Sequence, residues 1–395
     1  MRRSGLAVAA LLAVGLLPAA ASSSIGGVRA AVTASSGEIR VLRTAQPVER
    51  IAADGSRIAV ATAAQKMNTC DRIVVWSPKK RTYVRFNPGS NCNTAPTIDD
   101  IQELALAGKT VYWLDADGGM WVSLQVLSRT LGTHKTKTVS SLGLYSLSAY
   151  ESEYYGPFTF VGNLFGSGNL LVFNSWTACM EIPVGWPGAT CPQSAPGDEP
   201  MMLYSKQRLL KAVHGAGVEI ASAPDAQTGV SGIKTPDAVA GIAAVVAVDA
   251  KRVAVQFPDG SVTIYSAGGA VVRSIPVPSG TFSGFALQGA QLVTIRNGKL
   301  ELYNVSSGKL VKAISVPGGS QLDGLQKGLA VYVARRVHVL RLSDRKDVTF
   351  SLPRANLVDA QIEASGLFYA YNNPSGHSPG RVVFVPFARV LKKLR

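Results

Sequence analysis

The sequence predicts an all-β fold, a β-propeller of seven blades with four antiparallel strands in each blade; six or eight blades are the alternatives. Three hairpin turns start 38 residues apart, at Asp259-Gly260, Asn297-Gly298 and Arg335-Arg336. Each turn separates two runs in which apolar and polar residues alternate, which is the period of a half-buried strand. Glycine (39 residues) and proline (21 residues) are plentiful and only 16% of the residues are charged, which fits short strands joined by turns and argues against disorder or a coiled coil.

The second half of the chain repeats a four-stranded unit. Adding 38 residues to the last turn gives position 373, inside the polar segment NNPSGHSPG between LFYAY and RVVFVPF. The hairpins are followed by the strands SIPVP, AISVP and TFSLP, and then by the short strands SGFAL, LDGLQ and LVDAQI. Four strands in a unit of about 40 residues are typical of a propeller blade, whereas a β-helix has a shorter repeat and an ankyrin-like array needs helices. No apolar stripe with the period of a helix is found.

The first half fits the same plan with insertions. The first blade has its inner turn at Asp54-Gly55, the second has a turn at Asp117-Gly118, and the third runs from FTFVGNLFGSGNLLVFNSW through a long insertion to MMLYSKQRLLKAV. This division gives three blades before residue 237 and four after it. The segment GEIRVLRT (residues 37–44) is predicted to pair into the last blade, because a ring closed in this way leaves no open sheet edge.

The N-terminal residues have the three parts of a secretory signal peptide. Arg2 and Arg3 form the charged start, Leu6 to Leu17 the apolar stretch, and Ala19-Ala20-Ala21 the cleavage site. A membrane anchor is the alternative, but Pro18 ends the apolar run well short of the about 20 residues that span a bilayer. We therefore expect a signal in residues 1–21, a flexible linker in 22–36 and a single propeller domain in 37–395, without a transmembrane segment in the mature chain and located outside the cytoplasm.

The chain contains four cysteines, Cys70, Cys92, Cys179 and Cys191. An even number in an exported protein predicts disulfides, and pairing of sequence neighbours, one of three possible connectivities, would close two short loops. A zinc site is the alternative, but the chain has no Cys-x-x-Cys pair and no histidine at ligand spacing beside these residues. Connections in a propeller alternate between its two faces, so the assigned topology places all four cysteines on one face.

A resemblance to known propellers supports the fold. The segment VYWLDADGG (Val111 to Gly119) resembles the strand and turn of YWTD-type and TolB-like propellers, and the repeated hairpins are similar to WD40-like blades. The resemblance covers nearly the whole mature chain at the level of pattern. It implies a propeller fold and a binding role, and it carries over no active-site residue because propellers support unrelated functions.

The sequence predicts no catalytic, cofactor-binding or metal-binding set. His338, in VHVLRL, is expected to be a partly buried strand residue. The stretch Asp115 to Gly119 resembles the start of a calcium loop, but Val126 occupies the twelfth position where a carboxylate is needed, so a hairpin turn is expected. Asp99 and Asp100 are expected to begin a strand as solvated turn residues rather than to act as paired carboxylates. A site formed by acids and histidines from distant blades would have no local sequence pattern.

The candidate binding site is the longest irregular stretch, from Ser175 to Pro200. Long ordered loops in compact domains often carry function. This loop contains Trp176 and Trp186, and the preceding segment contains Tyr154 and Tyr155. Exposed aromatic side chains give large contact area at low entropic cost, so we expect them to bind a partner. The alternative is that the rings pack beneath the loop.

The chain has a net charge of +15, and basic residues are predicted to gather on the face of the propeller opposite the cysteines. The turns between the third and fourth strands are predicted to contain Lys79-Lys80-Arg81, Arg129, Lys206 with Arg208, Lys309 and Arg345-Lys346. We predict an exported, non-catalytic, monomeric propeller of the bacterial envelope that binds a protein or glycan through loops on one face, without nucleic acid. An envelope hydrolase or lyase with a metal or carboxylate pair at the channel mouth is the alternative, and a basic module on anionic cell-wall polymer the second.

Overall fold

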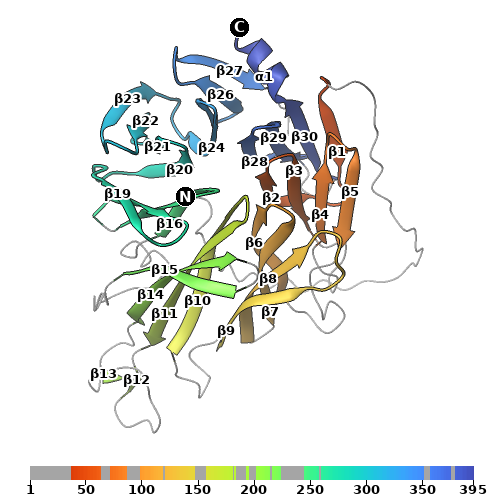
Figure 1. The fold of residues 1–395 in the computed structure, drawn as a ribbon. Coiled ribbons are helices and arrows are strands. Elements are labelled where there is room, and N and C mark those ends of the chain that lie inside the picture. The colour runs from red at the N-terminus through yellow and green to blue at the C-terminus, as the bar shows by residue number, and fades with distance from the viewer. Residues whose placement is uncertain are drawn as a thin grey trace, which may run out of the picture.

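The computed structural model describes residues 37–63, 72–86, 98–118, 121–146, 157–180, 182–183, 193–194, 202–213, 216–223, 244–257, 259–350, 356–374 and 379–395. These residues form seven four-stranded antiparallel sheets arranged as the blades of a ring (Figure 1). The predicted architecture, an all-β propeller with four antiparallel strands in each blade, is confirmed. The predicted signal and linker, residues 1–36, lie outside the described residues.

The blades follow the chain, and each runs from an inner first strand to an outer fourth strand. Blades 1 to 3 contain β2 (Val48–Asp54), β3 (Arg57–Thr62), β4 (Arg72–Ser77) and β5 (Thr82–Phe86); β6 (Ile98–Ala107), β7 (Thr110–Gly118), β8 (Trp121–Thr130) and β9 (Lys137–Ser146); and β10 (Pro157–Ser167), β11 (Leu170–Met180), β14 (Met202–Val213) and β15 (Ala216–Ala223). The short strands β12 (Ile182–Pro183) and β13 (Gln193–Ser194) pair in parallel outside the blades.

Blades 4 to 6 come from the repeated half of the sequence. They contain β16 (Ala244–Asp249), β17 (Arg252–Gln256), β18 (Val262–Ser266) and β19 (Val271–Ile275); β20 (Phe282–Gln288), β21 (Gln291–Arg296), β22 (Lys299–Asn304) and β23 (Leu310–Ser315); and β24 (Gln321–Gln326), β25 (Leu329–Val333), β26 (Val337–Arg341) and β27 (Lys346–Phe350). The turns at residues 259, 297 and 335 lie between the second and third strands, as predicted.

Blade 7 closes the ring by joining the two ends of the chain. It contains β28 (Asn356–Glu363), β29 (Gly366–Asn372), β30 (Arg381–Pro386) and, as its outer strand, β1 (Arg40–Arg43). Arg40 to Arg43 pair in antiparallel register with Phe384 to Arg381, so the predicted pairing of residues 37–44 into the last blade is confirmed. The inner strands β2, β6, β10, β16, β20, β24 and β28 contact one another in this order, and β28 contacts β2 again.

The core is divided among the joints between blades. Each apolar cluster of the described residues draws its side chains from two consecutive blades, and together the clusters run around the ring. At the joint of blades 1 and 2, for example, the fully buried Trp113 packs against Phe86 with ring centroids 5.8 Å apart. Burial of alternating strand residues against the next sheet is therefore what fixes one blade to its neighbour.

A short helix at the C-terminus was not predicted. The helix α1 (Phe387–Lys393) follows β30, and the buried Val390 and Leu394 pack into the cluster between blades 6 and 7 (Figure 1). At seven residues it has only two turns, too few for a 3.6-residue apolar pattern to stand out in the sequence. No helix among the residues described above is long and apolar enough to cross a membrane.

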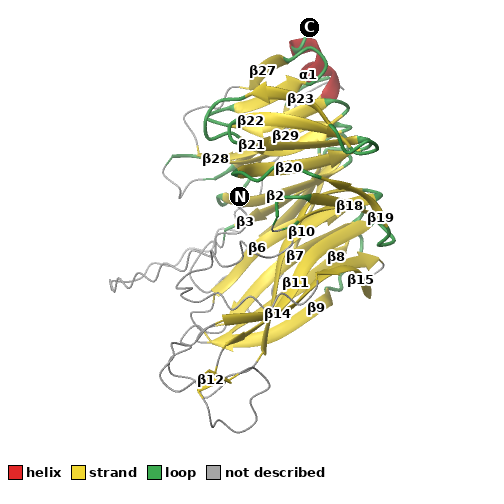
Figure 2. Ribbon diagram, turned by 90° about the vertical axis from the view of Figure 1, so that its left-hand side faces the viewer, coloured by secondary structure: helices red, strands yellow, loops and turns green. Residues whose placement is uncertain are grey.

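Blades 2 and 3 have longer strands than the blades of the repeated half, and this changes two predicted turns. Their strands have 8 to 12 residues (Figure 2), against 5 to 7 in blades 5 and 6. The strand β7 continues through Gly118, so Asp115 and Asp117 lie within a strand and not in the predicted hairpin turn. Strand β14 likewise continues without a turn, so Lys206 and Arg208 lie mid-strand.

Candidate functional site

Every inner strand is bent at its pairing with the second strand of its blade. In each of the seven blades the register between these two strands shifts once, as it does between Leu322 and Gly324 in β24. A β-bulge of this kind bends the strand, increases its twist and redirects a side chain. The bulges shape the wall of the ring's centre and leave backbone groups there that need partners from outside the ladder.

A cavity of about 260 Å³ lies at this centre. Its wall comes from the inner strands β2, β10, β16, β20, β24 and β28, with Gln256 from the end of β17, and most of it is alanine, valine, glycine, leucine and phenylalanine. The polar side chains in the wall are Gln256, Gln321, Asp323, Gln361 and Glu363. The cavity is thus mainly apolar with a few polar groups, the composition of ligand pockets in general.

Amide side chains hold blade 7 against blade 1. The Gln361 side chain accepts a hydrogen bond from the Ala53 amide (2.6 Å) and donates one to the Ile51 carbonyl (3.2 Å). The Asn372 side chain likewise accepts from the Val48 amide and donates to the Val48 carbonyl, both at 2.7 Å. These side chains replace a missing backbone ladder between two sheets, so their role is structural.

Hydrogen bonds from a backbone amide of one blade to a side chain of the preceding blade also join other blades. The Asn174 side chain of β11 accepts from the amide of Val245 in β16 at 3.1 Å. The Glu103 carboxylate of β6 accepts from the amide of Leu164 in β10. In each case an acceptor on one blade satisfies a backbone donor of the next blade, which fixes the spacing of the blades at the cavity.

Two carboxylates lie where the inner strands end, on the face of the ring that carries the turns between first and second strands. Asp54 accepts hydrogen bonds from the amides of Gly108 (2.5 Å) and Gly168 (3.1 Å), and Glu363 accepts one from the amide of Gly55 (3.1 Å). Burial raises the pKa of Asp54 above its ordinary value. Burial, with the charge of Asp54 as the second cause, raises the pKa of Glu363 to about 8.

Two further polar clusters lie within single blades. In blade 5 the buried Glu301 carboxylate binds Arg296 at 2.6 Å and accepts a hydrogen bond from the Tyr303 hydroxyl at 2.8 Å. In blade 6 Asp347 accepts from the Tyr332 hydroxyl (2.7 Å) and lies 2.9 Å from Nδ1 of His338. His338 stacks on Tyr332 with ring centroids 4.6 Å apart, so it is a partly buried strand residue as predicted. Among the residues whose placement is given, no three ligand-type side chains gather as a metal site.

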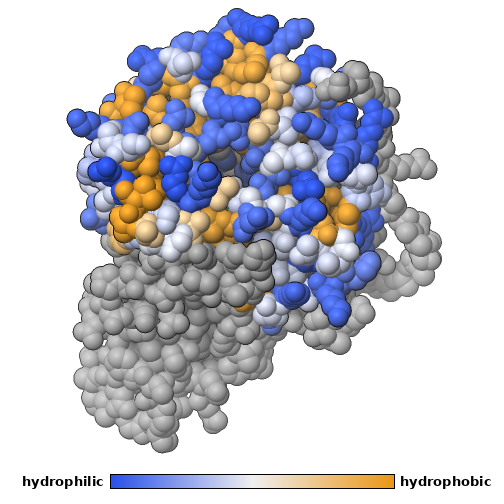
Figure 3. Space-filling model, viewed as in Figure 1, coloured by the Kyte–Doolittle hydropathy of each residue, from blue (hydrophilic) through white to orange (hydrophobic). Residues whose placement is uncertain are grey.

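The outer rim carries the other unusual surface. We define the rim strip as Val271 and Val272 of β19 with Leu310 and Val311 of β23, four exposed aliphatic residues on neighbouring blades. Figure 3 shows hydrophobic surface on the rim over these two strands, next to hydrophilic surface. Fourth strands are paired on one side only, so the strip lies along two open sheet edges.

The structure describes only some of the predicted binding residues. The backbone of Trp176 belongs to β11, paired with Phe160 and Gln207, because β11 continues to Met180. The predicted loop therefore does not begin at Ser175, and Trp176 is a strand residue. Cys179 is also in β11, opposite Leu203, but its side chain lies outside the described residues. The same holds for both the backbone and the side chains of Tyr154, Tyr155, Trp186, Cys70, Cys92 and Cys191.

The structure describes the positions of five charged residues that the sequence analysis singled out. Asp99 and Asp100 belong to β6, opposite Asp117 and Ala116 of β7, so strand pairing begins at or before them. Lys79 and Lys80 lie in the turn between β4 and β5, as predicted. Arg129 is the second-last residue of β8, with its guanidinium 4.7 Å from the centroid of the Phe86 ring, so it packs instead of being free in a turn.

The polar residues that link the blades were missed, although the sequence contains a signal for some of them. Gln288 and Gln326 end the inner strands of blades 5 and 6, 38 residues apart, and their side chains hydrogen-bond each other. The repeat that located the turns therefore also locates a polar residue before the first-to-second turns of blades 5 and 6. Asn174 and Asn372 have no such repeat, and only the structure shows their partners.

Comparisons with known proteins identify the fold of this chain but not its family. No family model matches the chain, and no curated protein matches it. Among solved structures, the β-propeller domain of the Trilobed protease from Pyrococcus furiosus is similar, with a TM-score of 0.50, 9% identity, and coverage of 87% of this chain and 94% of that chain. The Mitotic Checkpoint Complex structure (TM-score 0.47, 11% identity, 96% and 99% covered) and Sqt1 of Saccharomyces cerevisiae (0.43, 10%, 87% and 97%) also match.

Proposed function

We propose that this chain is an exported, non-catalytic β-propeller that binds a protein partner. The observation that carries the proposal is the wall of the central cavity, which is mainly apolar and whose amide side chain Gln361 is bonded to the backbone of the next blade. Polar groups engaged in this way hold the ring rigid. A rigid ring presents surface segments at low entropic cost, which suits a binding scaffold.

The proposal includes the face that carries the second-to-third connections. Cys70 lies in sequence between the second and third strands of blade 1, and Trp186 and Cys191 lie in sequence between the second and third strands of blade 3. We propose that Trp186, Tyr154 and Tyr155 contribute to partner binding on this surface. Disulfides between Cys70 and Cys92 and between Cys179 and Cys191 would limit its mobility.

One observation favours a second candidate function, an envelope hydrolase. Glu363 lines the cavity, the nearby charge of Asp54 is one cause of its raised pKa, and a Glu363 pKa of about 8 suits a general acid. Both carboxylates, however, accept hydrogen bonds from turn amides of other blades. This arrangement uses them as links between turns, so binding remains the better-supported function.

Covalently captured partners distinguish the two functions. The mature protein is incubated with an envelope extract of the source cells and cross-linked, and the captured protein is identified, purified and mixed with the chain again. We expect a defined complex by light scattering, formed equally by Asp54→Asn and Glu363→Gln variants, because these acids end inner strands on the face of the first-to-second turns and not on the proposed binding face. Failure to form any complex, together with release of a fragment from envelope polymer that Glu363→Gln abolishes, would establish the hydrolase instead.

Export is tested on the same protein. The intact mass of the chain recovered outside the cytoplasm should correspond to cleavage near Ala21, and peptides mapped without reduction should link Cys70 to Cys92. A mass that retains residues 1–21, or free thiols at both cysteines, would contradict export through an oxidising compartment.

A further inference from the structure

The rim strip is more exposed than aliphatic side chains usually are. The exposed fractions are 64% for Val271, 45% for Val272, 51% for Leu310 and 59% for Val311. Single exposed apolar residues need no explanation, but two adjacent pairs on the outer strands of neighbouring blades form a patch, and apolar patches mark interaction sites.

The two pairs are built in the same way. The register between β18 and β19 shifts after Ile264, so that Val271 lies opposite Tyr265 and Val272 is the extra residue. The register between β22 and β23 shifts in the same manner, with Leu310 opposite Tyr303 and Val311 extra. A bulge on an edge strand redirects the side chains at the bulge, and here it places two consecutive aliphatic residues at the rim.

The two pairs belong to one surface because blades 4 and 5 touch at the rim. Gly308, in the turn before β23, lies so close to β19 that a Cβ placed on it would be 3.5 Å from the Ser274 carbonyl and 3.7 Å from Cδ of Arg273. Both contacts are ordinary van der Waals distances. The beginning of β23 therefore packs beside β19, and a single partner segment can cover both pairs.

The surface around the strip is basic. Arg273 and Lys309 are exposed, and no ion pair within the described part of the chain engages either of them. Two acids of the same two blades are neutralised by other residues, Asp249 by Arg252 at 2.7 Å and Glu301 by Arg296 at 2.6 Å. A third, Asp259, lies in the turn between β17 and β18, at the end of β18 away from the residue opposite Val271, and accepts a hydrogen bond from the Ser261 amide. A partner that covers the strip therefore meets uncompensated positive charge, and acidic groups fit it.

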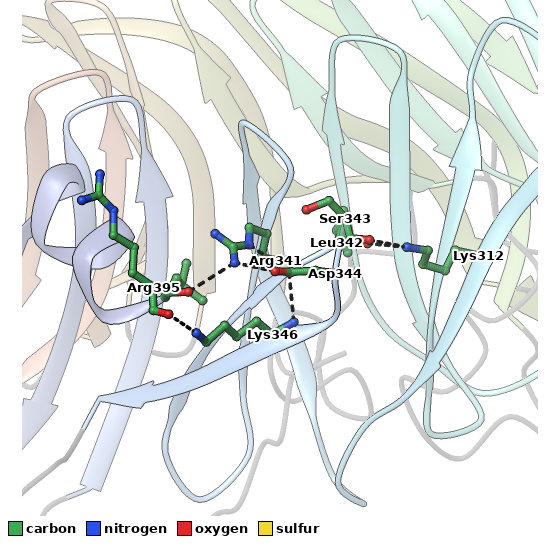
Figure 4. A network of polar contacts seen from close by, with 8 residues as sticks. Lys312, Arg341, Leu342, Ser343, Asp344, Lys346 and Arg395 are labelled. Atoms are coloured by element: carbon green, nitrogen blue, oxygen red, sulfur yellow. Dashed lines mark hydrogen bonds and ion pairs between the residues drawn. The ribbon is translucent and has the colours of Figure 1, made fainter.

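Blade 6 shows where the strip ends. Its fourth strand begins with Lys346 and Asp347 in place of an aliphatic pair. Figure 4 shows that its turn is held by polar contacts: Arg341 pairs with Asp344, Lys346 bonds the carbonyl of Arg395, and Lys312 of blade 5 bonds the Leu342 carbonyl at 2.6 Å. The same position in the repeat is thus closed by chain contacts in blade 6 and left open in blades 4 and 5.

From these observations we propose that the rim strip docks an acidic, extended segment of a partner protein, whose apolar side chains cover Val271, Val272, Leu310 and Val311 while its carboxylates meet Arg273 and Lys309. The inference rests on the proposed protein-binding function and names the partner's chemistry and a second surface for it. Apolar contact with the strip supplies affinity, and the basic border selects acidic over basic segments.

Three fluorescein-labelled ten-residue peptides test the proposal by anisotropy on the mature protein: alternating Leu and Asp, alternating Ser and Asp, and alternating Leu and Lys. We expect the Leu/Asp peptide to bind at least about tenfold more tightly than the other two, because only it offers both apolar and acidic groups. Equal binding of the Ser/Asp peptide would overturn the proposal and indicate a site for anionic polymer. Equal binding of the Leu/Lys peptide would overturn the role of the basic border.

Substitutions locate the binding. The double variant Val272→Ser with Val311→Ser should weaken binding of the Leu/Asp peptide about tenfold, whereas Val84→Ser, an equally exposed valine (43%) on β5, should not. Arg273→Gln with Lys309→Gln should also weaken it, with Lys299→Gln as the exposed control. Binding unchanged in the double valine variant would refute the site. The partner capture described above uses full proteins, so a partner captured equally by this variant would refute the strip and leave the binding function standing.

Discussion

The inner joints and the outer rim of this propeller use similar residues for opposite purposes. At the inner joints, valine and leucine side chains are buried, glycines such as Gly284 let strands of neighbouring blades approach, and amide side chains such as Gln361 bond the backbone of the next blade. At the rim, Val271 and Leu310 have no cover from the described residues and more than half of each is exposed. The difference teaches that stability resides in the inner joints, which leaves the outer strands available for binding.

The largest expected loss of stability comes from adding a side chain where two inner strands are in close contact. Gly284 of β20 has a φ of +100°, and a Cβ on it would collide with the Leu322 carbonyl oxygen of β24. Gly284→Ala should therefore lower the free energy of unfolding by roughly 3 kcal/mol or more, measured by urea denaturation. Gly318→Ala is the control, because its Cβ meets nothing within 4 Å. Equal stability of the two variants would mean that β20 and β24 are not in close contact.

Removal of a side-chain amide that joins two blades should lower the free energy of unfolding by less than Gly284→Ala does. Gln361→Leu leaves the Ala53 amide and the Ile51 carbonyl without their side-chain partner, which we expect to cost about 1–3 kcal/mol of unfolding free energy. Gln361→Glu keeps an acceptor for the Ala53 amide and should cost less at pH values at which the new carboxyl is neutral. A loss confined to Gln361→Glu, with the leucine variant unaffected, would contradict the role of these bonds.

The pH dependence of stability should reveal Glu363. The pKa of its carboxyl is about 8 in the folded protein against an ordinary 4.5, so the folded state binds the proton more tightly. The unfolding free energy should therefore fall as pH rises from about 4.5 to 8, by at most about 1.4 kcal/mol per pH unit from this group. Denaturation of the wild type and Glu363→Gln across this range measures it. Parallel curves for the two proteins would show that Glu363 titrates normally.

The smallest effect on stability is expected at the rim. Val272→Ser with Val311→Ser should change the free energy of unfolding by no more than about 0.5 kcal/mol per residue, because both side chains are exposed. Thermal denaturation measures this, with the same protein sample used for peptide binding. A stability loss as large as that of Gly284→Ala would mean that the strip is packed against other residues.

The contrast also explains what could be predicted from the sequence. Turn residues such as Asn297-Gly298 act locally and repeat every 38 residues, so the strands of blades 4 to 6 and the closing strand could be located. The long strands of blades 2 and 3 could not, because Asp115 and Lys206 are polar residues that a turn would also accept. The joints could not either, since Asn174 and Asn372 become informative only when another blade lies beside them.

Hydrogen exchange followed by mass spectrometry tests the division between inner joints and outer rim most directly. The amides of the inner strands β20, β24 and β28 should exchange slowly, and the outward amides of β19 and β23 should exchange much faster until the alternating Leu/Asp peptide is added, when those two strands alone become protected. Equal protection of β19 and β23 in the unbound protein, or a peptide that protects the inner strands instead, would contradict the account.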